Sequence, residues 1–158
     1  MKRIISIALL FTLATIAVVA SAQTSFAKQF KGKDGYSCIT ISKAALRLMP
    51  GQNVMGHYMG INVGSVADKL DRLEIIETST PRAATELKKA CEQWIESDGF
   101  EDFIDIDEEG ERTSIFIKTG SEQNVFLLLD DEKDGDTDVI ILYGTMTLEE
   151  MRNIINIK

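Results

Sequence analysis

The densest group of metal-ligating side chains in this sequence is an acidic segment between two apolar runs. Counted from Asp130, acids stand at positions one, three, five and nine as Asp130, Glu132, Asp134 and Asp138, and a glycine stands at position six. This is the spacing of a Ca²⁺-binding loop, but such a loop needs a bidentate Glu at position twelve, where this chain has Ile141. The flanking runs also have the character of strands, not of helices. The segment therefore favours a solvated hairpin turn, with Ca²⁺ binding as the alternative.

A second group of candidate ligands lies in residues 51–65, a glycine-rich segment without helical or strand periodicity that we expect to be a loop. Met55, His57 and Met59 are two residues apart, so an extended chain would direct their side chains to one side. Thioether and imidazole groups suit Cu(I). Methionine is also a common filler of irregular gaps, which is the structural alternative for these residues. This loop is the candidate site for copper or for a small ligand.

The two cysteines allow either a disulfide or two buried free thiols. Cys91 falls on the apolar face of an expected helix, and Cys38 lies in an expected strand with Ile39 and Ile41 on its other side. If the helix covers the face that Ile39 presents, Cys38 points away from Cys91. The sequence therefore favours two free thiols over a bridge.

Two pairs of carboxylates are the remaining candidates for catalysis, because glycoside hydrolysis requires only two acids. Asp105 and Asp107 lie in an acidic strand, and Glu149 and Glu150 lie in a helix-capping motif, so solvation and capping explain them. The sequence has no nucleophile elbow, phosphate-binding loop or zinc-binding helix motif. We expect a protein that is not an enzyme and that uses no cofactor.

Length and charge narrow the class of protein further. The chain has 158 residues, enough for one domain, with 17 Lys and Arg against 25 Asp and Glu and a net charge of −8. This negative charge repels phosphate and argues against nucleic-acid binding. An apolar fraction of 44% is too high for an intrinsically disordered chain.

Residues 1–22 have the features of a secretory signal. A basic start is followed by an uncharged apolar run from Ile4 to Ala20, and Ala20-Ser21-Ala22 provides small residues for a signal peptidase. We expect cleavage after Ala22 and no transmembrane segment in the mature chain; a retained anchor is the alternative. Since no cysteine stands at the cleavage site, we expect a periplasmic or envelope-associated protein without a lipid anchor.

The rest of the sequence predicts a mobile leader over residues 23–35, with Phe26 and Phe30 as aromatic anchors, and a single α+β domain over residues 36–158. The expected order is β-α-β-α-β-β-β-β-α, in which the last four strands form an antiparallel meander and helices pack on the sheet. Strands are expected at residues 36–41, 73–78, 103–107, 113–118, 124–129 and 138–143, and helices at residues 43–49, at 81–97 and after Thr147.

Two of these strands are apolar at every position, namely residues 125–129 (VFLLL) and 139–143 (VIILY). A strand with one wet face alternates between apolar and polar residues, so both faces of these strands require cover. Either helices cover one face and the leader or the 51–65 loop covers the other, or an uncovered face binds a protein partner or a second copy of the chain.

Three stretches carry a resemblance to a known family: CITISKAALRLMP (residues 38–50), KLDRLEIIETS (69–79) and NVFLLLDDEKDGDTDVIILYGTMTLEEM (124–151). In these the chain resembles domain of unknown function 4252, a family of small exported bacterial proteins known mainly from the Bacteroidetes. The resemblance implies a periplasmic or envelope location and brings no catalytic role with it. Some relatives resemble lipoproteins with a cysteine at the cleavage site, which this chain lacks.

Together these features predict an exported envelope protein that acts without catalysis, through contacts with another protein. The expected contact surfaces are the two apolar strands and an acidic surface, because residues 96–138 hold 16 acids and three bases. The alternative is a small-ligand or metal-binding protein that uses the 51–65 loop or the acidic turn at residues 130–138.

Overall fold

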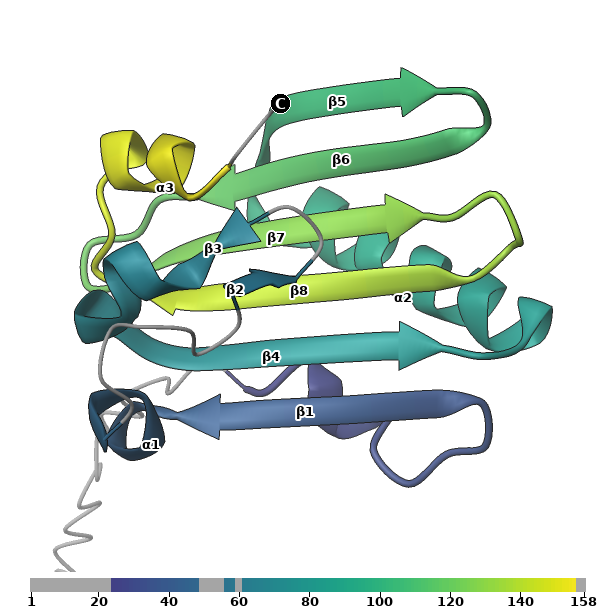
Figure 1. Ribbon diagram of the computed structural model, residues 1–158, viewed down its shortest axis with the longest axis horizontal. Coiled ribbons are helices and arrows are strands. Elements are labelled where there is room, and N and C mark those ends of the chain that lie inside the picture. The colour runs from purple at the N-terminus through teal and green to yellow at the C-terminus, as the bar shows by residue number, and fades with distance from the viewer. Residues whose placement is uncertain (1–23, 49–55, 59–60, 156–158) are drawn as a thin grey trace, which may run out of the picture.

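The structure is a computed structural model that describes residues 24–48, 56–58 and 61–155, and of residues 56–58 the backbone alone. Its centre is one antiparallel sheet of six strands in the order β1-β4-β8-β7-β6-β5, with helices on both faces (Figure 1). The predicted α+β class and element order are confirmed. The strands are β1 (Tyr36–Ser42), β4 (Leu70–Thr78), β5 (Glu101–Glu108), β6 (Glu111–Lys118), β7 (Asn124–Asp131) and β8 (Thr137–Gly144).

The last four strands form the predicted meander, in which each strand pairs with the next along the chain. A tight turn joins β5 to β6, where Glu109 and Gly110 both have positive φ, 51° and 91°, as a type I′ hairpin loop requires. β8 then pairs with β4, which in turn pairs with β1. The long helix α2 (Pro81–Asp98) therefore carries the chain from β4 across the sheet to the far edge, where β5 lies.

The helix ends follow from local sequence signals. The Thr80 side chain accepts a hydrogen bond from the Ala83 amide and Pro81 occupies the first turn of α2, which ends at Gly99 with φ 73°. α3 (Leu148–Ile154) begins with the predicted capping box between Thr147 and Glu150. No helix in the described part of the chain is long and apolar enough to cross a membrane.

One face of the sheet is covered by short elements that follow β1 and β8. These are α1 (Lys43–Leu48), the small hairpin of β2 (Gly56–Tyr58) and β3 (Ile61–Asn62), the 3-10 helix η2 (Val63–Lys69) and α3 (Figure 1). The hairpin and η2 lie where we expected a loop over residues 51–65. The expectation failed because glycines hide the strand pattern and because Ile61 and Val63 are ordered by burial in the core, a non-local effect.

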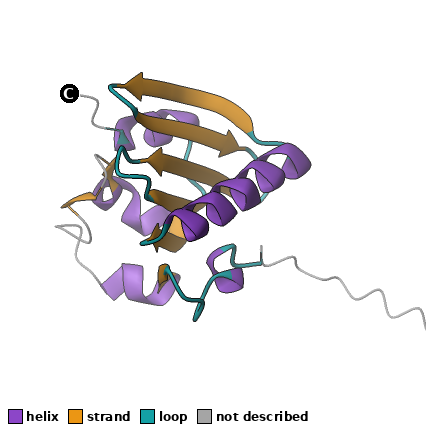
Figure 2. Ribbon diagram, turned by 90° about the vertical axis from the view of Figure 1, so that its right-hand side faces the viewer, coloured by secondary structure: helices purple, strands orange, loops and turns teal. Residues whose placement is uncertain are grey.

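The other face is covered by α2 and by the 3-10 helix η1 (Ala27–Gln29), which belongs to the predicted leader (Figure 2). The leader is folded here instead of mobile, and Phe26 and Phe30 are its buried anchors. Phe26 stacks on Trp94 of α2 with ring centroids 4.7 Å apart, and Phe30 stacks on Tyr36 at 5.0 Å. Aromatic burial of this kind is the physical reason that the segment is ordered.

The two uniformly apolar strands lie at the centre of the sheet and are buried on both faces by the chain itself. Phe126 and Leu128 point to the face that carries α1 and α3, and Val125 and Leu127 point to the face that carries α2. The prediction that residues 125–129 and 139–143 bind a partner or a second copy is therefore wrong, because every apolar residue of these two ranges is buried. The alternative interpretation, in which the chain itself covers both faces of these strands, is correct.

Candidate functional site

The candidate copper ligands lie largely outside the described residues. Met55 and Met59 are both outside them, and of His57 the structure gives only its backbone position in β2. Copper or small-ligand binding at this loop therefore stays a prediction.

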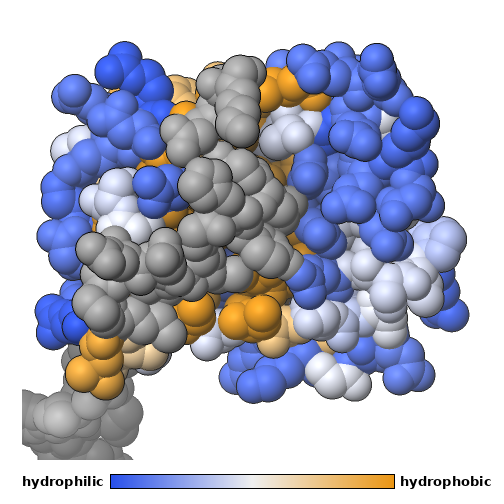
Figure 3. All heavy atoms as spheres, in the orientation of Figure 1, coloured by the Kyte–Doolittle hydropathy of each residue, from blue (hydrophilic) through white to orange (hydrophobic). Residues whose placement is uncertain are grey.

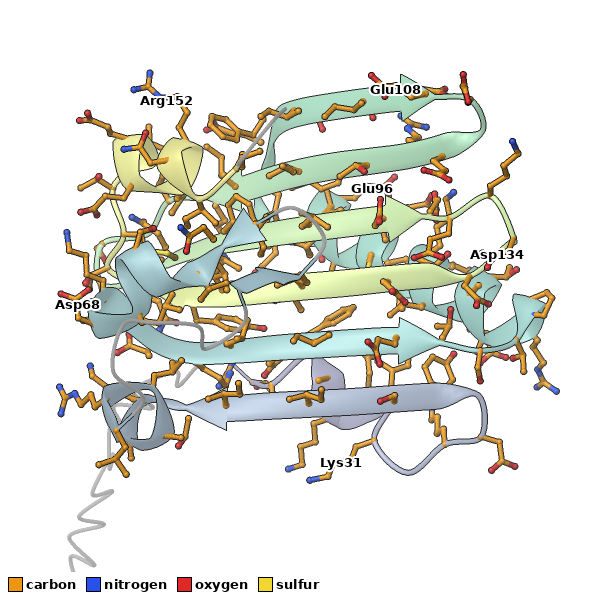
Figure 4. All side chains as sticks on the ribbon, viewed as in Figure 1. Lys31, Asp68, Glu96, Glu108, Asp134 and Arg152 are labelled. Atoms are coloured by element: carbon orange, nitrogen blue, oxygen red, sulfur yellow. The ribbon has the colours of Figure 1, made fainter. Side chains whose placement is uncertain are left out.

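The acidic segment forms the turn between β7 and β8, as the favoured interpretation predicted. Asp130 and Asp138 are directly opposite each other in the two strands, and an Asp130 carboxylate oxygen accepts a hydrogen bond from the Thr113 hydroxyl at 2.6 Å. Asp134 lies at the tip of the turn, at the end of the molecule where hydrophilic side chains gather (Figures 3 and 4). Among the described residues no group of three or more His, Cys, Asp or Glu has the arrangement of a metal site.

Asp138 is the most perturbed carboxyl of this turn. Burial, together with the charges of Glu132, Glu77 and Asp130, raises its pKa to about 6, against a hydrogen bond from the Thr78 backbone that lowers it. The pKa of Glu132 is raised as well, by burial and by its acidic neighbours. The turn is thus a region of unfavourable negative charge, and Ca²⁺ binding by Asp130, Glu132, Asp134 and Asp138 stays a prediction.

Both cysteines are free thiols in the structure. Contrary to the expected geometry, α2 covers the face that Cys38 presents, so Cys38 and Cys91 belong to the same apolar layer. Cys91 is fully buried and Cys38 is half-buried, and burial raises the pKa of each thiol. Free thiols, the favoured alternative, are what the structure contains.

Structural roles account for one carboxylate of each pair that we considered for catalysis. Asp105 accepts two hydrogen bonds of 2.9 Å from the Arg112 guanidinium and a third from the Ser114 hydroxyl, and these hold its pKa below the usual range. Glu150 closes the capping box of α3 and pairs with Lys69. These two carboxylates are occupied by structural partners.

A buried polar cluster in β4 and β8 was not anticipated from the sequence. The Glu74 carboxylate is fully buried, 2.7 Å from the Arg72 guanidinium, and it accepts hydrogen bonds from the Tyr143 hydroxyl at 3.3 Å and from the Ala27 amide at 3.0 Å. The Arg72 guanidinium also lies over the Tyr143 ring, 4.1 Å from its centroid. The cluster therefore ties the leader to the sheet.

Its signal in the sequence is the pair of opposite charges at alternate positions of an apolar strand, Arg72-Leu73-Glu74. Alternate residues share a face of a strand, so this pattern places the guanidinium and the carboxylate together. The pattern does not show whether that face of the strand is buried. Only a buried pair would contribute to the core of the protein, so the sequence alone does not reveal the cluster.

The two edges of the sheet differ in charge, and this difference defines the candidate interaction site. β5, the edge at the top of Figure 1, has the sequence EDFIDIDE with five acids in eight residues. β1, the opposite edge, has the sequence YSCITIS and carries no charge in seven residues. Proteins protect edge strands against further pairing with charge, proline or a bulge. β5 is protected in this way, and β1 is not.

The hydrogen-bond pattern identifies the backbone groups at the open edge of β1. The Ser79 amide donates to the Gly35 carbonyl at 3.0 Å, while the Tyr36 amide turns away from β4 and donates to Lys33. Antiparallel strands alternate between bonded and non-bonded pairs. Cys38, Thr40 and Ser42 therefore direct their amides and carbonyls outward, and no described strand pairs with them.

Exposed apolar side chains accompany this edge. In the described part of the chain three large apolar residues are exposed: Ile39 in β1, Leu48 at the end of α1, which follows β1 directly, and Leu148. Two of the three thus belong to β1 or its neighbouring helix. At the start of β1 there is also a hollow of about 360 Å³, lined by Lys33, Tyr36, Arg82 and Glu86 among others.

The fold defines the chain as a single-sheet α+β protein whose six antiparallel strands are covered on both faces. Within the described residues, no strand pairs with the outer edge of β1. The chain belongs to the family described as a domain of unknown function, DUF4252, whose model matches residues 30–154. The match begins at the second aromatic anchor of the leader and takes in all six strands of the sheet. No curated protein and no solved structure matches the chain.

Proposed function

We propose that this protein is an exported, non-enzymatic binding domain of the periplasm or envelope, which accepts an extended strand of a protein partner at the open edge of β1. The observation that carries the proposal is the contrast between an edge with five acids in eight residues and an edge with none in seven. Strand addition gains affinity from backbone hydrogen bonds, which need an open ladder of the kind that Cys38, Thr40 and Ser42 present.

The engaged carboxylates support binding over catalysis, and the N-terminal sequence supports export. The carboxyls of Asp105 and Glu150 are engaged by Arg112 and Lys69, so neither pair considered for catalysis offers two uncommitted acids. Export rests on the signal-like residues 1–22, and the exported protein is expected to begin at Gln23, which the mass of the secreted protein tests.

A photo-activated cross-linking residue placed at Ser37 in β1 tests the function in cells, with the same residue at Asp107 in β5 as the control for the other edge. We expect a defined adduct from position 37 and none from position 107. Thr40→Pro should remove this adduct, because proline lacks the outward amide, whereas Thr40→Val should keep it. Thermal unfolding of both variants checks that they are folded.

Equal adducts at both positions, or an adduct that Thr40→Pro leaves intact, would contradict strand addition at β1. The mass of the adduct also separates a different protein from a second copy of this chain.

A further inference from the structure

We propose that the strand accepted by β1 is an acidic segment of another protein, held by cations that surround this edge. The inference rests on the proposed function and adds the chemistry of the partner. It follows from how charge is distributed around β1, which differs from the distribution in the rest of the molecule.

The segment that contains β1 is the basic part of an acidic protein. Residues 24–48 carry five Lys and Arg against one acid, a net charge of +4, whereas residues 61–155 carry nine against 24, a net charge of −15. The five cations stand on both sides of the uncharged strand, three before it and two after it: Lys28, Lys31, Lys33, Lys43 and Arg47.

Lys31 lies beside the middle of the strand. Its side chain extends past the outer edge of β1 (Figure 4). Its charge also acts on the Cys38 thiol, where it lowers the pKa against the larger raising effects of burial and of Glu74. A strand paired with β1 would therefore run alongside this ammonium group.

Most of these cations are available to a partner. Lys43 pairs with Asp71, but Lys28, Lys31 and Arg47 form no ion pair with the described residues, and all three are exposed. Exposed cations beside an open ladder attract carboxylates and set the orientation and the choice of the incoming strand.

The same charges disfavour a second copy of the chain at this edge. Two β1 strands paired antiparallel about a two-fold axis would bring Lys33 of one copy toward Lys43 and Arg47 of the other, and the Lys31 side chains of the two copies toward each other. Like charges across paired strands are destabilising. The acidic β5 edge of a second copy would meet the charge requirement, but repeated β1-to-β5 pairing is head-to-tail and would build rings or open filaments, which light scattering would detect as large assemblies.

Three synthetic nine-residue probes test the inference: alternating Val and Thr peptides that carry three Glu, three Gln or three Lys at matched positions. Their affinities for the purified protein are measured by fluorescence anisotropy at 50 and 500 mM salt. If each of three exposed ion pairs contributes about twofold, the Glu peptide should bind about tenfold more tightly than the Gln peptide at low salt. Most of this difference should vanish at high salt, because surface charges are then screened.

Two variants of equal net charge locate the effect. Lys31→Glu should weaken binding of the Glu peptide and strengthen binding of the Lys peptide, whereas Lys133→Glu, in the distant β7–β8 turn, should change neither by more than about twofold. Thr40→Pro should abolish binding of all three peptides. Amide hydrogen exchange should slow at Thr40 and Ser42 when the Glu peptide is bound.

The outcomes separate the two levels of the proposal. Equal affinities for the three peptides, each lost in Thr40→Pro, would overturn the acidic partner and leave strand addition standing. No binding of any peptide, or binding that Thr40→Pro does not affect, would overturn strand addition itself. Self-association of the purified protein that Thr40→Pro abolishes, measured by light scattering, would replace the acidic partner with a second copy.

Discussion

Removal of the Glu74 carboxylate should be one of the most destabilising single changes in this protein. The carboxylate has no exposed surface and is tied to three groups: the Arg72 guanidinium, the Tyr143 hydroxyl and the Ala27 amide. Breaking a buried ion pair from one side typically costs about 3–5 kcal/mol. Since the Arg72 side chain is 22% exposed and can regain some hydration, we expect Glu74→Ala to cost about 3 kcal/mol.

Two related variants separate the contribution of the Glu74 charge from that of its hydrogen bonds. Glu74→Gln keeps an acceptor for the Ala27 amide and loses the charge, so it should cost about half as much as Glu74→Ala. In the double variant Arg72→Met with Glu74→Leu, neither charge remains in the core. Its cost should be well below the sum of the single substitutions Arg72→Met and Glu74→Leu, because buried ion pairs are often replaced by apolar pairs at little cost.

Urea unfolding followed by Trp94 fluorescence measures these free energies, since Trp94 stacks on Phe26 of the leader and reports its release. Glu77→Ala, three residues along the same strand and half-buried, is the matched control and should change stability by less than about 0.5 kcal/mol. A loss below about 1 kcal/mol for Glu74→Ala, or a loss equal to that of the control, would refute the role assigned to the cluster.

Three further predictions concern other parts of the fold. The pKa of Asp138 is raised from 3.8 to about 6, so the folded state binds this proton more tightly than the unfolded state and stability should rise as the pH falls from 7 to 5. Asp138→Asn should flatten this rise and add about 1 kcal/mol at pH 7 in urea titrations, after allowance for partial solvent screening, whereas Asp134→Asn should leave the rise in place. Gly144→Ala should lower the free energy of unfolding by about 3 kcal/mol, because the new Cβ would stand 2.3 Å from the Lys69 carbonyl oxygen. Thermal unfolding measures this loss, and Gly32→Ala is the reference, because nothing lies within 4 Å of its Cβ and only the positive φ of 78° opposes a side chain there. A loss smaller than that of Gly32→Ala would contradict this packing. A thiol reagent should label Cys38 well before Cys91 in the folded protein, and a single labelling rate or an intact disulfide by mass spectrometry would show that the thiols are placed otherwise.

Local signals in the sequence determined most elements of the fold. Thr80 with Pro81, the Thr147 capping box and Gly99 fix helix ends through hydrogen bonds and φ angles within a few residues, which is why they can be read from the chain alone. The apolar periodicity of the strands likewise gave the meander and the α+β class.

The tertiary structure alone decided which surfaces are covered. VFLLL and VIILY require cover on both faces, but only the fold shows that α2 and the leader supply one side and α1, η2 and α3 the other. The leader itself has weak periodicity, and its order comes from Tyr36 at the start of β1 and, above all, from Trp94 and Glu74, which are distant in sequence.

The candidate site shows the same division. The sequence by itself predicted that residues 36–41 (YSCITI) form an uncharged strand that follows a lysine-containing leader, and that residues 103–107 (FIDID) form an acidic strand. Only the tertiary structure decided that these two strands are the edges of one sheet, because strand order depends on pairing between segments far apart in the chain. An uncharged strand in the middle of a sheet is part of the core, and the same strand at an edge is an open ladder of hydrogen-bonding groups.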